Sequence, residues 1–343
     1  MRSILPLVGL LAILSAVTVY KTVTQNTHKN AAPKEIVALF SQWKQKYQKL
    51  YASPNEDMHR LGVFHAQKLS VDKANLEYAA ALLARDSQVL SAPVYELNEF
   101  ADLSNEEFTV KYTGAKVPEE PLPVYDSSND DTQVVDQGLQ QETYGVHIRN
   151  QGGCGSCWAF SAIASFEKQY SDATRQRFDL SQQELVDCDR GSNGCYGGFI
   201  HSGLNYILRG SIATAGAYPY VAARGACRGV GKVKKIGFSV QNYGFDLGAT
   251  NGAISRGKIV GVTLFGTGKF RYVNKNGDTF DASLSGECGQ TINHAVNAFM
   301  QGNGRLAILN SWGTSWGNGG WKWIKPCNSK NLWGNQGSST WAQ

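Results

Sequence analysis

The residues best suited to chemistry are a cysteine in a glycine-rich run and two polar residues far downstream. The run is Gln151-Gly-Gly-Cys-Gly-Ser-Cys157, and His294 and Asn310 follow near the C-terminal end. A thiol attacks a carbonyl carbon only as the thiolate, so a nucleophilic cysteine needs an imidazole within hydrogen-bonding reach. We therefore interpret Cys157, His294 and Asn310 as a nucleophile, its base and the residue that orients the base.

The segment that follows the cysteine is predicted to be a helix. Residues 158–170 read WAFSAIASFEKQY, which is rich in Ala and apolar at helical spacing. A helix that begins at or just before Cys157 would direct the positive end of its dipole at the sulfur. This position favours the thiolate.

These residues lie within motifs that resemble those of papain-like cysteine peptidases. A local signature of this kind around a cysteine does not transfer between unrelated families. The resemblance implies an α+β, papain-like two-domain fold, with a helical left domain at about 150–240 and a β-sheet right domain at about 240–343. The motifs follow in family order: residues 151–161, LSQQELVDC at 180–188, GCYGG at 194–198, YPY at 218–220, CGQTINHA at 288–295 and NSWGTSWG at 310–317.

The resemblance also implies a role for each residue of the site. Cys157 would attack the scissile carbonyl carbon, and His294, held as imidazolium beside the thiolate, would protonate the leaving amine. Asn310 would accept a hydrogen bond from the imidazole, and Trp312 would shield that bond from water. The Gln151 side-chain amide and the Cys157 backbone N–H would form the oxyanion hole.

The resemblance favours an endopeptidase of the cathepsin L-like branch. No cofactor and no metal are expected. Gly197 and Gly198 would pair with the substrate backbone, and an apolar P2 residue is expected. Protein and peptide substrates, the chain's own propeptide and cystatin-like inhibitors are the expected partners of a monomer. The main side-chain pocket would be lined by Phe199, Ile200, Thr263, Ile292 and Ala295.

Seven cysteines leave at least one thiol without an intramolecular partner. Spacing alone does not give the connectivity of the other six. The Cys154-x-x-Cys157 pair could instead be a redox motif or half of a zinc site, although no second Cys-x-x-Cys follows. The family resemblance implies three disulfides that leave Cys157 free, which are Cys154 with Cys195, Cys188 with Cys227, and Cys288 with Cys327.

The first twenty residues have the pattern of a secretory signal peptide. Arg2 precedes an apolar stretch over residues 4–20, with small residues at Ser15 and Ala16. A transmembrane anchor is the alternative, but the stretch is short for a bilayer and contains Pro6. We predict a signal at 1–20, entry to the secretory pathway, no membrane attachment after cleavage, and a lysosomal, vacuolar or extracellular destination.

Residues 33–121 are predicted to form an inhibitory propeptide domain before a peptidase domain at 131–343. Five apolar residues between Ile36 and Tyr47 fall on one helix face, and a longer helix is predicted from about residue 55 to 85. NEFAD at 98–102 resembles a second propeptide motif. An ordinary helical subdomain is the alternative. Six residues of the longer helix resemble the ERFNIN pattern of papain-like propeptides: Glu56, Arg60, Phe64, Gln67, Val71 and Asn75.

Two other classes of function compete with a peptidase zymogen. A papain-like protein kept only for binding would normally lose Cys157, His294 or Gln151, yet all three are present. A thiol-disulfide oxidoreductase would need Cys154 free. The formal net charge is +5, and the basic run at 232–235 is more typical of a loop edge than of a nucleic-acid site, so no nucleic-acid partner is expected.

The sequence departs from the family pattern at two places that matter. Residues 299–302 read FMQG where the family usually has Val-Gly-Tyr-Gly, and Trp333 stands where the family commonly has its last cysteine. These departures leave the third disulfide and the floor of the main pocket open.

Overall fold

The computed structural model describes residues 32–85, 94–123, 147–210, 212–229, 237–274, 279–328 and 338–342. Their contacts divide the chain into two compact units, one of residues 1–106 with 272–276 and one of residues 107–271 with 277–343. The predicted signal at 1–20, the basic run at 232–235 and Trp333 lie outside the described residues. Within the described part, no helix is both long and apolar enough for a membrane crossing.

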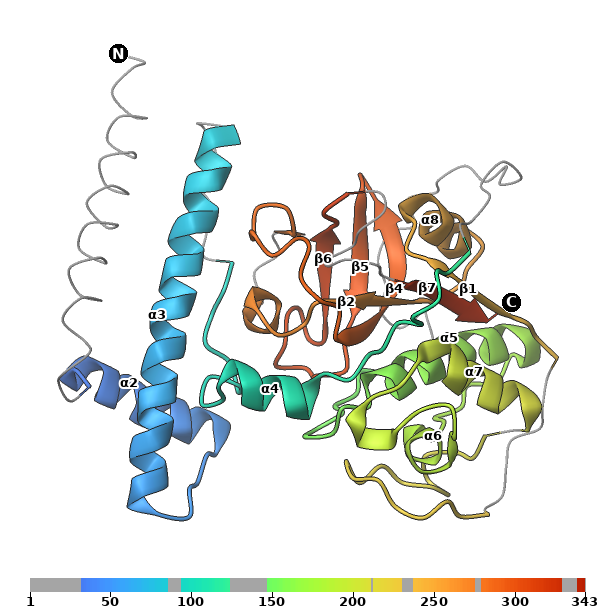
Figure 1. The fold of residues 1–343 in the computed structure, drawn as a ribbon, viewed down its shortest axis with the longest axis horizontal. Helices are drawn as coiled ribbons and strands as arrows, with labels where there is room; N and C mark the ends of the chain where they lie inside the picture. The colour runs from blue at the N-terminus through green and yellow to red at the C-terminus, as the bar shows by residue number, and fades with distance from the viewer. Residues whose placement is uncertain are drawn as a thin grey trace. The chain divides into compact units, whose positions relative to one another are not determined.

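The first unit is built on two helices, α2 (Lys34–Tyr47) and α3 (Pro54–Arg85) (Figure 1). The structure places the longer predicted helix within one residue of its expected start. Two aromatic side chains of α2, Phe40 and Trp43, are buried against Phe64 of α3, with ring centroids 5.1 and 5.2 Å from that ring. Aromatic packing of this kind joins the two helices.

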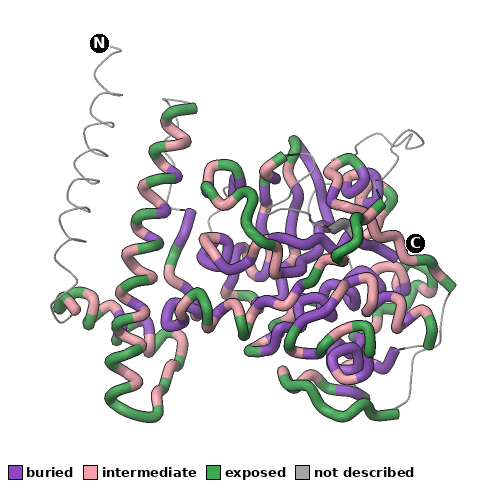
Figure 2. The backbone as a smooth tube through the Cα atoms, viewed as in Figure 1, coloured by how far each residue is buried: buried purple, intermediate pink, exposed green. Residues whose placement is uncertain are grey.

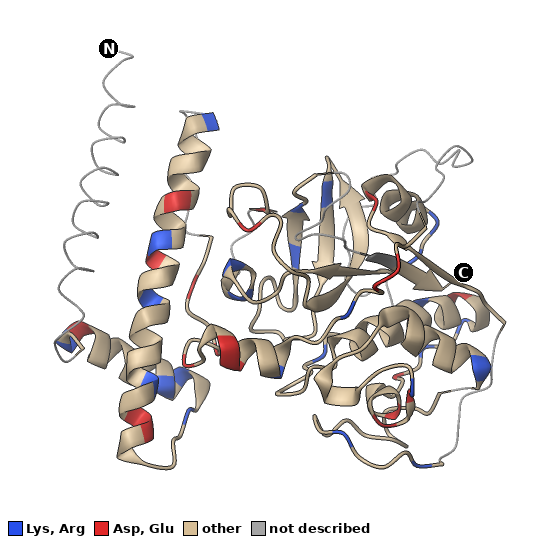
Figure 3. Ribbon diagram, viewed as in Figure 1, with Lys and Arg blue, Asp and Glu red and all other residues tan. Residues whose placement is uncertain are grey.

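Polar residues of α3 hold the extended segment that follows it, and ion pairs at i,i+4 spacing lie along the helix (Figure 3). Three hydrogen bonds join side chains of the predicted propeptide pattern to backbone carbonyls of this segment. A backbone carbonyl that receives a bond needs no strand partner, so a segment without regular structure can be ordered. The bonds are Arg60 Nη1 to Asp102 O at 2.9 Å, Gln67 Nε2 to Leu103 O at 3.2 Å, and Asn75 Nδ2 to Tyr95 O at 2.9 Å.

The second unit combines a group of helices with a seven-stranded sheet. The strand order is β1-β7-β2-β4-β5-β6-β3, and neighbouring strands are antiparallel except β3 with β6, which are parallel. Its helices are α5 (Cys157–Thr174), α6 (Gln182–Cys188), α7 (Ile200–Arg209) and α8 (Leu247–Ser255), while α4 (Asn105–Tyr112) spans the sequence boundary between the units. The strands are β1 (Val240–Gly244), β2 (Val260–Leu264), β3 (Phe280–Asp281), β4 (His294–Gly302), β5 (Arg305–Leu309), β6 (Trp321–Lys325) and β7 (Ser338–Ala342).

The core of this unit lies where α5 packs against β4 and α7 (Figure 2). All nine residues of β4 are buried, as are most of those of α5. Ser181 is the N-cap of α6, and its hydroxyl accepts a bond from the Glu184 N–H at 3.0 Å. The helical and sheet parts of the unit therefore share one buried seam, and Cys157 and His294 stand at the first positions of two elements that border it.

The FMQG departure falls at the end of β4. The register of β4 against β5 shifts between Ala298 and Met300, which marks a β-bulge or similar irregularity. Phe299 and Met300 are buried in a small cluster with Ile259 and Ala307. The two larger side chains are thus accommodated in a hydrophobic cluster by a local change of the strand.

Candidate active site

The nucleophile expected from the sequence is the first residue of α5. Cys157 is fully buried, and it is the one free cysteine among the seven, all of which lie in described ranges. A helix N-terminus favours a negative charge on the group that it faces. The other six form the disulfides Cys154–Cys195, Cys188–Cys227 and Cys288–Cys327, so Cys154 is not free to act as the second thiol of a redox pair.

The base and its orienting residue come from neighbouring strands. His294 begins β4, and Asn310 directly follows β5, the strand paired with β4. The imidazole Nε2 lies 2.8 Å from the Asn310 Oδ1, and the Trp312 indole stacks on the imidazole with ring centroids 4.3 Å apart. Because Asn310 Oδ1 can only accept, Nε2 carries the proton. The other nitrogen, Nδ1, has no hydrogen-bond partner within the described residues and remains available to a thiol.

A buried amide on β4 bonds the strand to the helix of the nucleophile. The Asn297 Nδ2 donates to the Ser161 carbonyl and to the Ser165 Oγ, both at 3.1 Å. The Ser161 hydroxyl donates in turn to the Val296 carbonyl at 3.2 Å. These bonds are buried and therefore costly to break, which sets the position of the start of α5 relative to the start of β4. The sequence reasoning missed Asn297, whose only signal was an amide in an otherwise apolar strand.

The predicted oxyanion-hole residue has both ends of its amide engaged. The Gln151 side chain is fully buried, and its Oε1 accepts a bond from the Ser311 hydroxyl at 2.7 Å. Its Nε2 donates to the Cys154 carbonyl at 2.9 Å and to the Tyr112 carbonyl at 3.1 Å. Ser311, which the sequence reasoning also missed, lies inside the NSWGTSWG motif and orients the amide nitrogen towards Tyr112.

The segment after α4 is hydrogen-bonded to the residue that precedes His294. The N–H groups of Gly114 and Ala115 donate to the Asn293 carbonyl at 2.7 and 2.8 Å. The Gly198 N–H donates to the Gly114 carbonyl at 2.8 Å, and the Lys116 N–H donates to the Gly198 carbonyl at 2.9 Å. Gly198, predicted to pair with substrate backbone, pairs here with the chain's own N-terminal segment in a parallel bridge.

Trp312 also contacts this segment. Its indole N–H donates to the Tyr112 carbonyl at 3.2 Å, so that carbonyl receives bonds from both Trp312 and Gln151. The Phe108 ring, buried at the middle of α4, meets the Trp312 ring edge-on with centroids 5.1 Å apart. The residue that covers the His294–Asn310 bond is therefore itself covered by residues 108–112.

Burial disfavours the charged forms of the nucleophile and the base in this form of the protein. Desolvation raises the pKa of Cys157 to about 12, although backbone N–H groups of Ala295, Trp158 and Gly114 oppose it. Desolvation lowers the pKa of His294 to about 4, against the opposing effect of the bond to Asn310. In this form, burial therefore opposes the thiolate–imidazolium pair expected from the sequence, because residues 114–115 help to exclude the water that would solvate both charges.

The predicted pocket residues are brought together only in part. Thr263 on β2 pairs directly with Ala295 on β4, and both are buried. Ile200 is buried near Gly261, where an added Cβ would come within 3.0 Å of its Cγ2. The Phe199 ring instead lies against His201, with ring centroids 5.4 Å apart, and Ile292 is half-buried before β4.

Comparison with known proteins shows which family the chain belongs to. Residues 133–337 match the family model of papain family cysteine proteases, and residues 40–108 match that of the cathepsin propeptide inhibitor domain. The chain belongs to the papain family of cysteine proteases.

Several relatives are similar to this papain-family protease over most of its length. Caricain from Carica papaya is 33% identical over 296 residues, which cover 82% of this chain and 79% of caricain. Cathepsin L 2 from Paramecium tetraurelia is 32% identical over 303 residues, which cover 86% of this chain and 90% of the relative. The structure of a recombinant stem bromelain precursor superposes with a TM-score of 0.71 at 27% identity, covering 90% of this chain and 99% of that one.

These similarities establish a papain-like α+β fold and a protease made as a zymogen with its own inhibitory propeptide.

Proposed function

We propose that this papain-family protease is a cysteine endopeptidase whose catalytic triad is Cys157, His294 and Asn310. The observation that carries the proposal is the 2.8 Å bond from His294 Nε2 to Asn310 Oδ1 beneath the stacked Trp312. This bond leaves Nδ1 as the imidazole nitrogen that exchanges a proton with the thiol.

In the mature enzyme, removal of residues 107–123 re-exposes the thiol and the imidazole to water. Solvation then favours the charged forms of both groups, so Cys157 attacks the substrate carbonyl as thiolate and the His294 imidazolium protonates the leaving amine. The same imidazole later takes a proton from the water that hydrolyses the acyl-enzyme. The Gln151 Nε2 and the Cys157 backbone N–H donate to the oxyanion, at the hole where Gln151 now meets the Tyr112 carbonyl.

The proposed specificity is for an apolar P2 side chain. Its support is the apolar character of Ile200 and Ala295, both buried beside β2 and β4, and the pairing of Thr263 with Ala295. Gly198 is proposed to pair with substrate backbone, because its N–H and carbonyl already bond an extended chain here. Gly197, Phe199 and Ile292 are proposed as further contacts.

The propeptide is proposed to be of the ERFNIN type found in the cathepsin L-like branch. Its support is the use of Arg60, Gln67 and Asn75 to hold the backbone that follows α3. The proposed route is secretory, with a lysosomal, vacuolar or extracellular destination, since three disulfides favour an oxidising compartment. A monomeric state and inhibition by cystatin-like proteins remain predictions.

Hydrolysis of fluorogenic peptides by processed enzyme tests the proposal. A peptide with Leu at P2 is compared with one that has Lys at P2, and Cys157→Ala and an epoxide-type thiol alkylator serve as controls. We expect activity that requires reductant, disappears in both controls and favours Leu at least about tenfold in kcat/KM. Activity that survives in Cys157→Ala would exclude the proposed nucleophile, and equal rates on both peptides would exclude the proposed pocket.

A further inference from the structure

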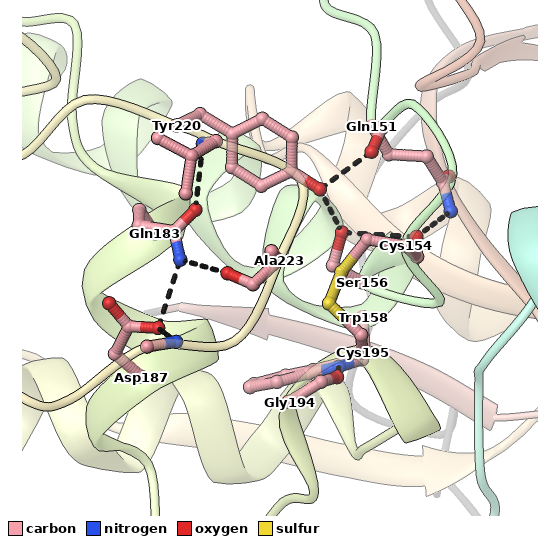
Figure 4. Close-up of a disulfide and its surroundings, with 12 residues drawn as sticks. Gln151, Cys154, Ser156, Trp158, Gln183, Asp187, Gly194, Cys195, Tyr220 and Ala223 are labelled. Atoms are coloured by element: carbon pink, nitrogen blue, oxygen red, sulfur yellow. Dashed lines mark hydrogen bonds between the residues drawn. A yellow bond between two sulfur atoms is a disulfide. The ribbon is translucent and has the colours of Figure 1, made fainter.

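One tyrosine hydroxyl is hydrogen-bonded to Gln151 and to Ser156, the residue before Cys157 (Figure 4). The Tyr220 Oη is 2.6 Å from the Gln151 carbonyl oxygen and 2.6 Å from the Ser156 Oγ. Gln151 carries the side-chain donor of the hole, and Ser156 immediately precedes Cys157, whose N–H is the other donor. The hydroxyl therefore bonds to both backbone segments that present the donors.

The direction of each bond follows from what each group can donate. A carbonyl oxygen only accepts, so the Tyr220 hydroxyl proton lies on the Gln151 carbonyl. The Ser156 hydroxyl then donates to the Tyr220 oxygen. Together with the chain from 151 to 156, these two bonds close a ring that ties the start of the loop to its end. Ser156 has one other acceptor, the Cys154 carbonyl, at a long 3.4 Å.

The position of Tyr220 is itself set by contacts on both sides of its backbone. Its ring packs edge-on against Phe160 of α5, with ring centroids 4.9 Å apart. The next residue, Val221, donates its N–H to the Gln183 Oε1 at 2.9 Å, and the Gln183 Nε2 donates to the Ala223 carbonyl at 2.7 Å. Figure 4 shows that Gln183 of α6, which makes these bonds, and Gln151 lie on opposite sides of Tyr220. The hydroxyl is thus presented by two helices, α5 and α6.

We infer that Tyr220 is a positioning residue for peptide-bond hydrolysis, because its hydroxyl holds Gln151 and the Cys157 N–H at the separation that the oxyanion needs. This inference rests on the roles proposed above for Gln151 and Cys157. An oxyanion donor is effective only when it is already placed where the negative charge develops. Loss of the hydroxyl therefore weakens binding of the transition state more than binding of the substrate.

The YPY motif offers a matched control in Tyr218. The Tyr218 hydroxyl is also hydrogen-bonded, to the Asp187 Oδ2 at 2.8 Å and to the Ala226 carbonyl at 3.2 Å, and Tyr218 is buried. Within the described part of the chain, no hydrogen bond joins the Tyr218 hydroxyl to residues 151–157. Tyr218→Phe and Tyr220→Phe each remove one hydroxyl from the same loop and keep the ring, so a general loss of stability affects both variants.

The test compares both variants with the wild type as full chains processed to the mature enzyme and titrated with an epoxide-type alkylator. For Tyr220→Phe we expect kcat to fall about tenfold while KM stays within about twofold. Its affinity for a peptide aldehyde, which forms an oxyanion on the enzyme, should fall about tenfold. Its rate of alkylation by iodoacetamide, which forms no oxyanion, should equal that of the wild type. Tyr218→Phe should match the wild type in all four measurements.

Several results overturn the inference. A change in KM equal to that in kcat, slower alkylation by iodoacetamide, or the same losses in Tyr218→Phe would each indicate general distortion of the loop. A Ser156→Ala variant adds a second test, because its loss of kcat and that of Tyr220→Phe should be less than multiplicative when combined. If the wild type itself hydrolyses no peptide, the proposed function fails and takes the inference with it, whereas an active wild type with an unaffected Tyr220→Phe overturns the inference alone.

Discussion

Replacement of Gly114 by alanine should open the zymogen, because the backbone leaves no room for a side chain there. A Cβ added at Gly114 would lie 2.1 Å from the Gly155 carbonyl oxygen and 2.7 Å from its carbon. These are main-chain atoms in the loop before Cys157, next to a disulfide-bonded cysteine. They cannot swing aside as the end of a long side chain could, so the prosegment itself must move.

The cost of that movement follows from the bonds that Gly114 makes. Its N–H donates to the Asn293 carbonyl, and its carbonyl accepts from the Gly198 N–H. A hydrogen bond contributes about 0.5–1.5 kcal/mol net, so the loss of both weakens the closed state by about 2 kcal/mol. At about 1.4 kcal/mol per factor of ten, the open fraction should rise roughly 30-fold.

Alkylation of Cys157 in the intact precursor measures the open fraction. The thiol is fully buried in the closed state, and the other six cysteines are in disulfides, so iodoacetamide reports on Cys157 alone. At pH 7.5, Gly114→Ala should be alkylated roughly 30-fold faster than the wild type. Gly62→Ala is the matched control, because a Cβ at Gly62 on α3 meets no atom within 4 Å, and its rate should be unchanged. Equal rates for Gly114→Ala and the wild type would refute the steric reasoning.

Three further outcomes are expected. Arg149→Ala should lower the free energy of unfolding by about 3–5 kcal/mol in urea titrations, because Arg149 binds the buried Glu167 carboxylate through bonds of 2.9 and 2.6 Å. Adding Glu167→Gln to Arg149→Ala should restore part of that free energy. A loss below about 1 kcal/mol in Arg149→Ala would contradict a buried ion pair at this position. Burial raises the pKa of Glu287 to about 7 from its ordinary 4.5, so its ionisation costs stability above pH 7, and the cost fades as the pH falls to 4.5. In a Cys157→Ala precursor, Glu287→Gln should therefore raise Tm at pH 8 but not at pH 4.5, and an equal shift at both pH values would exclude this cause. Since burial raises the pKa of Cys157, the intact precursor at pH 8 should lack the ultraviolet absorbance of a thiolate relative to Cys157→Ala, whereas thiolate absorbance equal to that of the processed enzyme would indicate a preformed thiolate.

Much of the fold and of the candidate site could be predicted from local patterns. The helix after Cys157 and the long helix of the first unit both depend on residues close together in the chain, and the structure starts each within one residue of its expected position. The nucleophile, the base and the oxyanion-hole amide could be proposed from the sequence, because each catalytic role needs a particular functional group. The family resemblance then predicted which distant motifs come together in the folded chain.

The tertiary structure decided how those groups behave in the zymogen. Burial by many neighbours, including Gly114, disfavours the expected charged forms of Cys157 and His294. The FMQG departure proved to be a strand irregularity rather than a change at the catalytic residues.

Sequence by itself determined which chemical groups this protease carries and which helices present them, because helix periodicity and capping act over a few residues. Only the tertiary structure decided which carbonyl Gln151 meets, which hydroxyl ties its loop to Ser156, and how far water is kept from Cys157. Those properties arise from hydrogen bonds and burial between residues far apart in the chain, such as Tyr220 and Gln151, which are 69 positions apart, and no local pattern encodes such pairs.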